Sequence, residues 1–143
     1  MYLAAIIDVY SRFIVGWSLA NTLAAEASLG VIRQAVVEHG APQILNSDQG
    51  CQFTCSPQYV TYLREQDIAI SMDGKGRALD NFYIERFCRT IMYQHIFLNP
   101  ADDGRQLYRE IEKWLHRYHH RDHHRDHQGI NRVKHIQRYR KAA

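Results

Sequence analysis

The first twenty residues constrain the fold of this chain more than any other segment. Residues 2–9 and 13–19 are two apolar, β-prone runs, and Tyr10, Ser11 and Arg12 between them are typical of a hairpin turn. The first run is apolar at almost every position, which is the pattern of a strand that is buried on both faces. A sheet containing such a strand needs covering elements on both sides.

Strand-like and helical segments alternate through the rest of the chain. A helix with Leu29 and Ile32 on its apolar face ends at Gly40, and a helix begins at Ser56-Pro57. We also expect strands at residues 43–46 and 68–72, a helix capped by Asp80 or Asn81, and a long helix from about residue 102 with Leu107, Ile111, Trp114 and Tyr118 along one face. The order β-β-α-β-α-β-α-α predicts an α/β fold in which helices flank a mixed sheet.

Length and composition limit the class of protein. A chain of 143 residues, 45% of them hydrophobic, matches one globular domain. Its apolar runs fall short of the roughly 18 residues that a membrane helix needs, and the first residues do not resemble a signal peptide. Three cysteines, Cys51, Cys55 and Cys88, are too few and too uneven for a disulfide framework. We therefore expect a cytoplasmic protein with free thiols and no membrane partner.

Charge is distributed unevenly along the chain. Residues 1–85 contain 5 basic and 9 acidic side chains, whereas residues 86–143 contain 13 basic and 6 acidic ones and eight of the nine histidines. This asymmetry is what an acidic catalytic or metal pocket beside a nucleic-acid surface would produce. A solvated helix face is the alternative interpretation.

Asp48 and Glu85 are the candidate catalytic and metal-binding residues. Asp48 follows a predicted strand, at the position where open α/β sheets bind ligands, and Glu85 lies in the first turn of a predicted helix. Two converging carboxylates supply the oxygen ligands that hard divalent cations prefer. Ordinary turn formation by Asp48 and a helix-dipole role for Glu85 are the structural alternatives.

Four ordered blocks of sequence resemble one known family. They are residues 2–12 (YLAAIIDVYSR), 14–17 (IVGW), 46–54 (NSDQGCQFT) and 71–87 (SMDGKGRALDNFYIERF). These blocks resemble the integrase catalytic core of insertion-sequence transposases, which are DDE recombinases similar to retroviral integrases. The resemblance extends to about residue 130. It implies a ribonuclease-H-like fold, with residues 1–130 as the core and residues 131–143 as a basic C-terminal tail.

The resemblance also implies an activity. Asp48 and Glu85 correspond to the family's second catalytic Asp and its catalytic Glu, which hold Mg²⁺ (or Mn²⁺) for DNA cleavage and strand transfer. Lys75, Arg77 and Arg89 would contact DNA phosphates. The implied partners are the element ends and the target DNA, together with a second copy of the chain or an intact transposase. The expected location is then the nucleoid.

The sequence departs from the family pattern in three places. The family's first catalytic Asp lies on a strand that would precede Tyr2, so we expect this chain alone to be inactive. Asp48 and Glu85 are separated by 36 residues, one more than is usual in the family, and His119-His120-Arg121-Asp122 is repeated at residues 123–126. A non-catalytic DNA-binding or partner-binding remnant of a degenerate mobile element is therefore the alternative function.

The histidine-rich segment does not predict a zinc site. The histidines between residues 116 and 127 lack the usual zinc-ligand spacings, so zinc is not expected.

The resemblance also has a consequence for the sheet. In the ribonuclease-H-like fold the strand before Tyr2 is central, between the strands at residues 2–9 and 43–46. Without it, either those two strands pair directly or a gap remains and the protein self-associates.

Overall fold

The two apolar runs at the start of the chain form the predicted hairpin. Strand β1 (Tyr2–Ile7) pairs antiparallel with strand β2 (Ile14–Ala20). In the connecting turn the Asp8 amide donates to the Phe13 carbonyl and the Arg12 amide donates to the Asp8 carbonyl, both at 2.8 Å. Arg12 has a positive φ of 60°, which few non-glycine residues adopt. The turn therefore has a specific, constrained geometry.

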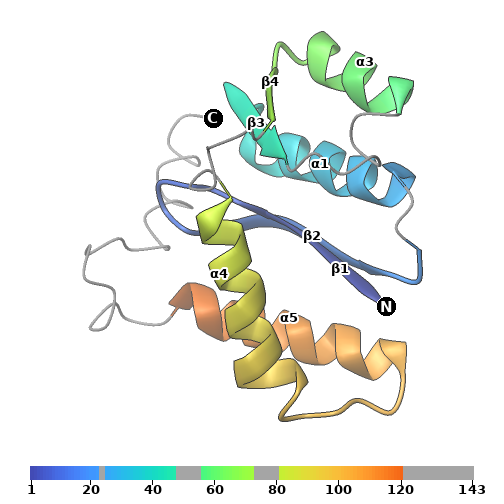
Figure 1. Ribbon diagram of the computed structural model, residues 1–143, viewed down its shortest axis with the longest axis vertical. Coiled ribbons are helices and arrows are strands. Elements are labelled where there is room, and N and C mark those ends of the chain that lie inside the picture. Colours follow the sequence, from blue (N-terminus) through green and yellow to red (C-terminus); the bar gives the residue numbers. More distant parts are fainter. Residues whose placement is uncertain (23–24, 48–55, 73–80, 121–143) are drawn as a thin grey trace.

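The remaining elements follow the predicted order (Figure 1). This computed structural model describes residues 1–22, 25–47, 56–72 and 81–120. After the hairpin come α1 (Ala25–His39), β3 (Ile44–Ser47), α3 (Pro57–Glu65), β4 (Ala69–Met72), α4 (Phe82–Ile91), the π-helix η1 (Met92–Ile96) and α5 (Gly104–His120). Strands β3 and β4 pair in parallel.

Local sequence explains where the helices begin and end. Gly40, with φ of +86°, ends α1 and donates its amide to the Val36 carbonyl at 2.8 Å. Ser56 and Pro57 begin α3, as predicted. Asn81 is the N-cap residue of α4, although its side chain forms no capping hydrogen bond.

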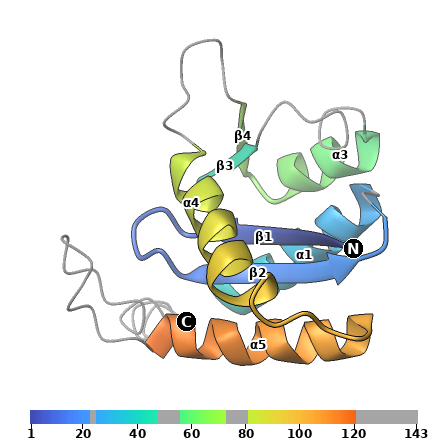
Figure 2. The same cartoon turned by 60° about the horizontal axis from the view of Figure 1, so that its bottom comes forward.

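Strand β1 connects two hydrophobic clusters on opposite faces of the hairpin. Leu3, Ala5 and Ile7 pack against the cluster built by α4, α5 and β2, whose buried members are Ile14, Phe87, Ile91, Ile111, Trp114 and Leu115. Ile6 packs against the other cluster, which consists of Leu29, Ile32, Tyr59, Leu63 and Ile68 from α1, α3 and the residue before β4. Figure 2 shows α5 running beneath the hairpin and α4 crossing it. Both faces of β1 are thus apolar, as its sequence predicts.

The described strands form two separate sheets. One consists of β1 and β2, the other of β3 and β4, and no described strand joins them. The expectation that β1 and β3 pair directly is therefore wrong, whereas a gap between them is what the structure shows. Self-association stays a prediction. Within the described ranges, no helix combines the length and apolarity needed to cross a bilayer.

Gly16 in β2 lets α1 approach the hairpin closely. A Cβ atom at Gly16 would lie 3.0 Å from Val31 Cγ1, 3.2 Å from the Val31 carbonyl oxygen and 3.3 Å from Ala35 Cβ. We expect Gly16→Val to destabilise the fold by about 1–3 kcal/mol through overpacking, measured as a lower urea midpoint.

Gly30→Ala is the matched control for that substitution. A Cβ atom at Gly30 meets nothing within 4 Å, and Gly30 lies inside α1. Alanine there should be neutral or stabilising by up to about 1 kcal/mol. A Gly16→Val protein as stable as the wild type would contradict the close packing of α1 on β2.

Candidate functional site

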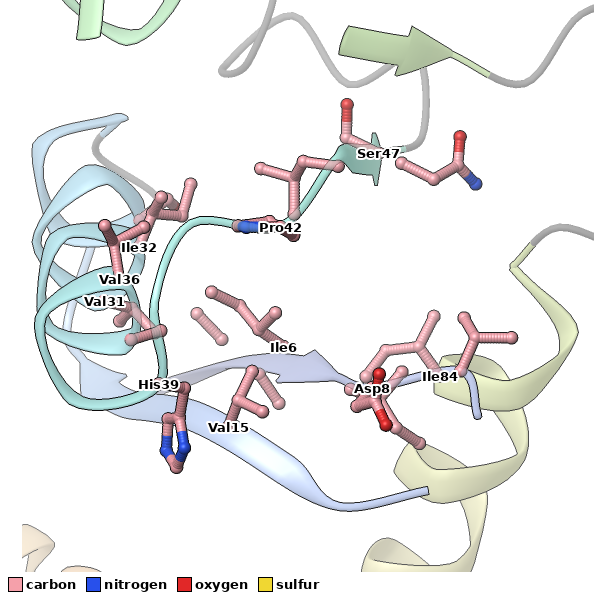
Figure 3. Close-up of a pocket in the computed structure, with 18 of the residues that line it drawn as sticks. Ile6, Asp8, Val15, Val31, Ile32, Val36, His39, Pro42, Ser47 and Ile84 are labelled. Atoms are coloured by element: carbon pink, nitrogen blue, oxygen red, sulfur yellow. The ribbon is translucent and has the colours of Figure 1, made fainter. Parts of the chain in front are cut away.

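A cavity of about 640 Å³ lies between the two sheets. Figure 3 shows the hairpin on one side of this inter-sheet cavity and β3 on the opposite side, with Val31, Ile32 and Val36 of α1 and Ile84 of α4 on the two remaining sides. Most of its lining is apolar. The polar lining residues contributed by β3, α4 and the hairpin turn are Asp8, Asn46, Ser47, Asn81 and Glu85.

The end of β3 and the start of α4 are brought together at this cavity. Asn46 Nδ2 donates to Asn81 Oδ1 at 3.3 Å, which links the strand to the N-cap residue of the helix. Ser47, the last residue of β3, and Glu85, in the first turn of α4, line the same cavity. Asp48 is bonded directly to Ser47 in the chain. The fold therefore places Ser47, the residue before Asp48, beside the helix turn that carries Glu85.

Leu45 ties β3 to the hydrophobic core from the other side. It packs against the cluster that contains Tyr59 of α3, whose side chain is only 2% exposed. Burial raises the pKa of Tyr59 above its ordinary value, and the Ser47 side chain opposes this effect. Because the same cluster contains Leu29 and Ile32 of α1, the position of β3 depends on both helices.

The hairpin turn positions the start of α4. Asp8 Oδ2 accepts hydrogen bonds from the Ser11 amide at 2.8 Å and from Ser11 Oγ at 2.5 Å, which stabilises the turn. Arg12 bonds to the Val9 carbonyl, and its guanidinium lies 3.1 Å from the centre of the Tyr83 ring. This cation–π contact fixes the first turn of α4, two residues before Glu85.

Glu85 and Arg89 lie one turn apart on α4, and both side chains are exposed. Cys88, also on α4, is half-buried and lines the cavity. Burial, followed by the negative charge of Glu85, raises the pKa of the Cys88 thiol. The pKa of the Cys88 thiol therefore depends both on the charge of Glu85 and on the burial of the thiol beside the cavity.

Part of the predicted site lies outside the described residues. This is the case for Asp48, Lys75 and Arg77, whereas Glu85 and Arg89 are on α4 as predicted. Sequence reasoning missed the contact of Arg12 with Tyr83 and the proximity of Cys88 to Glu85. The three-residue spacing of Glu85 and Cys88 on a predicted helix could have indicated that their side chains lie close together.

Metal-binding groups are few in the part of the chain that the structure describes. No three His, Cys, Asp or Glu side chains there converge in a way that could hold a metal ion. His116 and His120 stack at 4.2 Å between ring centres on α5. The described carboxylates that line the cavity are those of Asp8 and Glu85.

Comparison with known proteins identifies the family. The family model "Integrase core domain" matches residues 1–78, and a second model with the same description matches residues 66–134. The chain belongs to the integrase core domain family. The resemblance of the four sequence blocks is thereby confirmed.

Curated relatives of this integrase core are bacterial transposases. The transposase for insertion sequence element IS904 of Lactococcus lactis is 35% identical over 120 residues, covering 80% of this chain and 47% of the relative. Transposase InsF for insertion sequence IS3A of Escherichia coli is 31% identical over 98 residues, covering 67% of this chain and 34% of the relative. The chain thus spans half or less of the length of these relatives.

Solved structures confirm the ribonuclease-H-like fold of this integrase core. The HTLV-2 integrase catalytic core domain in complex with magnesium has a TM-score of 0.68 at 18% identity, covering 92% of this chain and 82% of that one. A chain of the simian T-cell lymphotropic virus intasome has a TM-score of 0.75 at 15% identity, covering 94% of this chain and 47% of that one. At such low sequence identity, these similarities show that the folds are alike and nothing more.

The proximity of Glu85 and Cys88 can be tested by alkylation. We expect Cys88 to react slowly with iodoacetamide near pH 8, because its pKa is raised and little thiolate is present. In Glu85→Gln the loss of negative charge should lower that pKa and accelerate the reaction, by up to about tenfold for each pKa unit. Mass spectrometry of the Cys88 peptide between pH 7 and 10 measures the rates.

The control for this measurement is Glu112→Gln, which removes an exposed carboxylate from α5 instead. Its Cys88 rate should equal that of the wild type. Identical pH profiles for the wild type and Glu85→Gln would show that Glu85 does not act on the thiol.

Proposed function

We propose that this integrase core acts in DNA transposition, holding a divalent cation and DNA at the polar end of the inter-sheet cavity. The observation that carries the proposal is the convergence of β3 and the first turn of α4, joined by the Asn46–Asn81 hydrogen bond. The resemblance assigns the two catalytic carboxylates to Asp48, the residue after β3 in the sequence, and to Glu85 in that first turn. The bacterial relatives are insertion-sequence transposases, which supports this function.

The donor set fits Mg²⁺ better than a softer metal. Glu85 is an exposed carboxylate at the cavity, Asp48 follows Ser47, and carboxylate oxygens are the ligands that Mg²⁺ prefers. When bound, such a cation neutralises charge that develops on a phosphodiester during cleavage and joining. The integrase core neighbour solved with magnesium is consistent with this choice.

The acidic residues of the proposed site would bind the cation, and the basic residues would bind DNA. Glu85 and Asp48 would hold the cation through their carboxylate oxygens. Arg89, exposed one turn after Glu85, would bind a phosphate of DNA lying along α4, and Lys75 and Arg77 would add contacts from the segment before the helix. The Arg12–Tyr83 contact would keep the first turn of α4 in place as DNA binds.

The cation site can be tested by calorimetric titration with Mn²⁺. We expect Asp48→Asn and Glu85→Gln each to weaken binding at least about tenfold, because each substitution removes a carboxylate ligand. Glu112→Gln on α5 is the matched control and should bind as the wild type does. Equal affinity of all four proteins would remove Asp48 and Glu85 from the proposed site.

The DNA surface can be tested by duplex binding at several salt concentrations. We expect binding without strong sequence preference, with affinity falling steeply between 50 and 200 mM salt because counterions are released. Arg89→Ala should weaken binding and reduce the salt slope by about 1. Arg105→Ala, at the distant start of α5, should change neither (Figure 1). Binding that is independent of salt would contradict the electrostatic account.

A strand-transfer assay separates catalysis from binding alone. Joining of a DNA 3′-hydroxyl to target DNA in Mg²⁺ would be measured on this chain and on a version extended by one Asp-bearing strand before Tyr2. Catalytic function predicts joining by the extended version and loss of joining when Glu85→Gln is added. The non-catalytic alternative predicts salt-sensitive DNA binding with joining by neither protein.

A further inference from the structure

The end of α5 carries three histidines with different surroundings. His119 contacts the hairpin, where its Nε2 accepts a hydrogen bond from the Ile14 amide at 3.1 Å and its ring stacks on Phe13 with 3.9 Å between ring centres. His116 and His120, by contrast, are exposed. The structure therefore engages one of the three histidines in packing and presents the other two, four residues apart, to solvent.

The two exposed histidines lie side by side. One helical turn separates His116 from His120, and their rings stack with 4.2 Å between centres and 23° between planes. A metal ion shared by two imidazoles lies about 2 Å from each nitrogen, so the two nitrogens must come within about 4 Å of each other. Rings at the observed separation can each direct one nitrogen toward such an ion. Two histidines four residues apart on one helix are also a recurrent metal-binding arrangement.

A hydrogen bond fixes the position of the proton on one of the rings. His120 Nδ1 lies 2.7 Å from the carbonyl oxygen of His116. Because a carbonyl oxygen only accepts hydrogen bonds, Nδ1 is the donor, and in the neutral ring Nε2 then carries the lone pair. Metal-binding histidines characteristically donate their second ring nitrogen in this way. The His120 ring is therefore oriented as a ligand before any metal binds.

The neighbouring charges select the class of metal ion. Lys113 and Arg117 are exposed, and each precedes one of the two histidines by three residues. Glu112, also exposed, lies one turn before His116. Two cationic neighbours and one anionic neighbour give no net attraction for a cation, so binding has to come from coordination to nitrogen. Imidazole nitrogen suits Cu²⁺, Ni²⁺ and Zn²⁺, and Cu²⁺ binds most tightly, whereas Mg²⁺ prefers oxygen ligands.

We propose that His116 and His120 form a binding site for late first-row transition-metal dications at the end of α5. It is an open site with two protein ligands, and it differs from the closed four-ligand zinc sites whose spacings the histidine-rich segment lacks. Its nitrogen donors distinguish it from the carboxylates proposed to hold Mg²⁺. The inference does not depend on the function proposed above.

Occupancy of this two-histidine site stiffens the end of α5. An ion bound by residues one turn apart holds that turn closed, whereas helix ends otherwise fray. His119 lies in the same turn and accepts the hydrogen bond from the Ile14 amide. A bound ion therefore also favours the contact between α5 and the hairpin.

The experiment uses Ni²⁺ as the probe, because Ni²⁺ binds imidazole without oxidising the thiols of the chain. The background protein is the full chain with the histidines beyond residue 120 replaced, by His123→Gln, His124→Gln, His127→Gln and His135→Gln. We expect it to bind Ni²⁺ in calorimetric titrations, with paramagnetic broadening of NMR signals that is strongest at residues 116–120. Affinity should fall between about pH 7.5 and about pH 5.5, because protons compete for the same nitrogens.

Single substitutions in this background identify the ligands. His116→Gln and His120→Gln should each weaken Ni²⁺ binding at least about tenfold, because each removes one of two imidazoles. Both side chains are exposed, so both proteins should fold, which circular dichroism verifies. Ni²⁺ should slow hydrogen exchange of the Ile14 amide in the background protein and not in either variant.

A double substitution tests the spacing while keeping the number of histidines constant. Lys113→His combined with His116→Gln places the two histidines seven residues apart, about 10 Å along the helix axis, where they cannot share one ion. It also removes a positive charge. Weakening at least about tenfold in this protein therefore supports chelation by neighbouring histidines, since charge attraction alone would strengthen binding.

Two results would overturn the proposal. One is equal Ni²⁺ affinity of the background protein and His116→Gln, which would place the bound ion elsewhere. The other is Ni²⁺ binding by the wild type that is absent from the folded background protein, which would assign the ion to the replaced histidines.

Discussion

The structure depends on the two-sided packing of β1. Its alternate side chains enter two hydrophobic clusters, one shared with α4 and α5 and the other with α1 and α3. Because successive residues of a strand point to opposite faces, one short apolar segment holds both layers together. Strand β1 therefore connects the helix that carries Glu85 to the cluster formed by α1 and α3.

This arrangement places the candidate site at a junction between layers. The hairpin turn holds the first turn of α4 through Arg12 and Tyr83, and Leu45 holds β3 against the cluster that contains Tyr59. The Asn46–Asn81 hydrogen bond then links the two elements directly. The positions of Glu85 and of the end of β3 are therefore set by contacts from three different parts of the chain.

Most elements of the fold could be predicted because their signals are local. Turn residues, the Gly40 helix end and the Ser56-Pro57 helix start act over a few residues, and each lies where it was expected. The π-helical continuation of α4 into η1 was not predicted, because apolar periodicity does not distinguish it from an α-helix. The prediction that β1 and β3 pair directly was wrong. The described strands form two sheets, and residues of α1 and α4 line the cavity between them.

The sequence by itself determined the order of elements, the family and the identity of the candidate residues Asp48 and Glu85. These properties depend on residue type and spacing along the chain. Only the tertiary structure decided that two strand edges border one cavity, that Arg12 contacts Tyr83, and that the end of β3 meets the start of α4. Such contacts join residues far apart in the chain, and their geometry is set by how the helices pack against both sheets rather than by any local pattern.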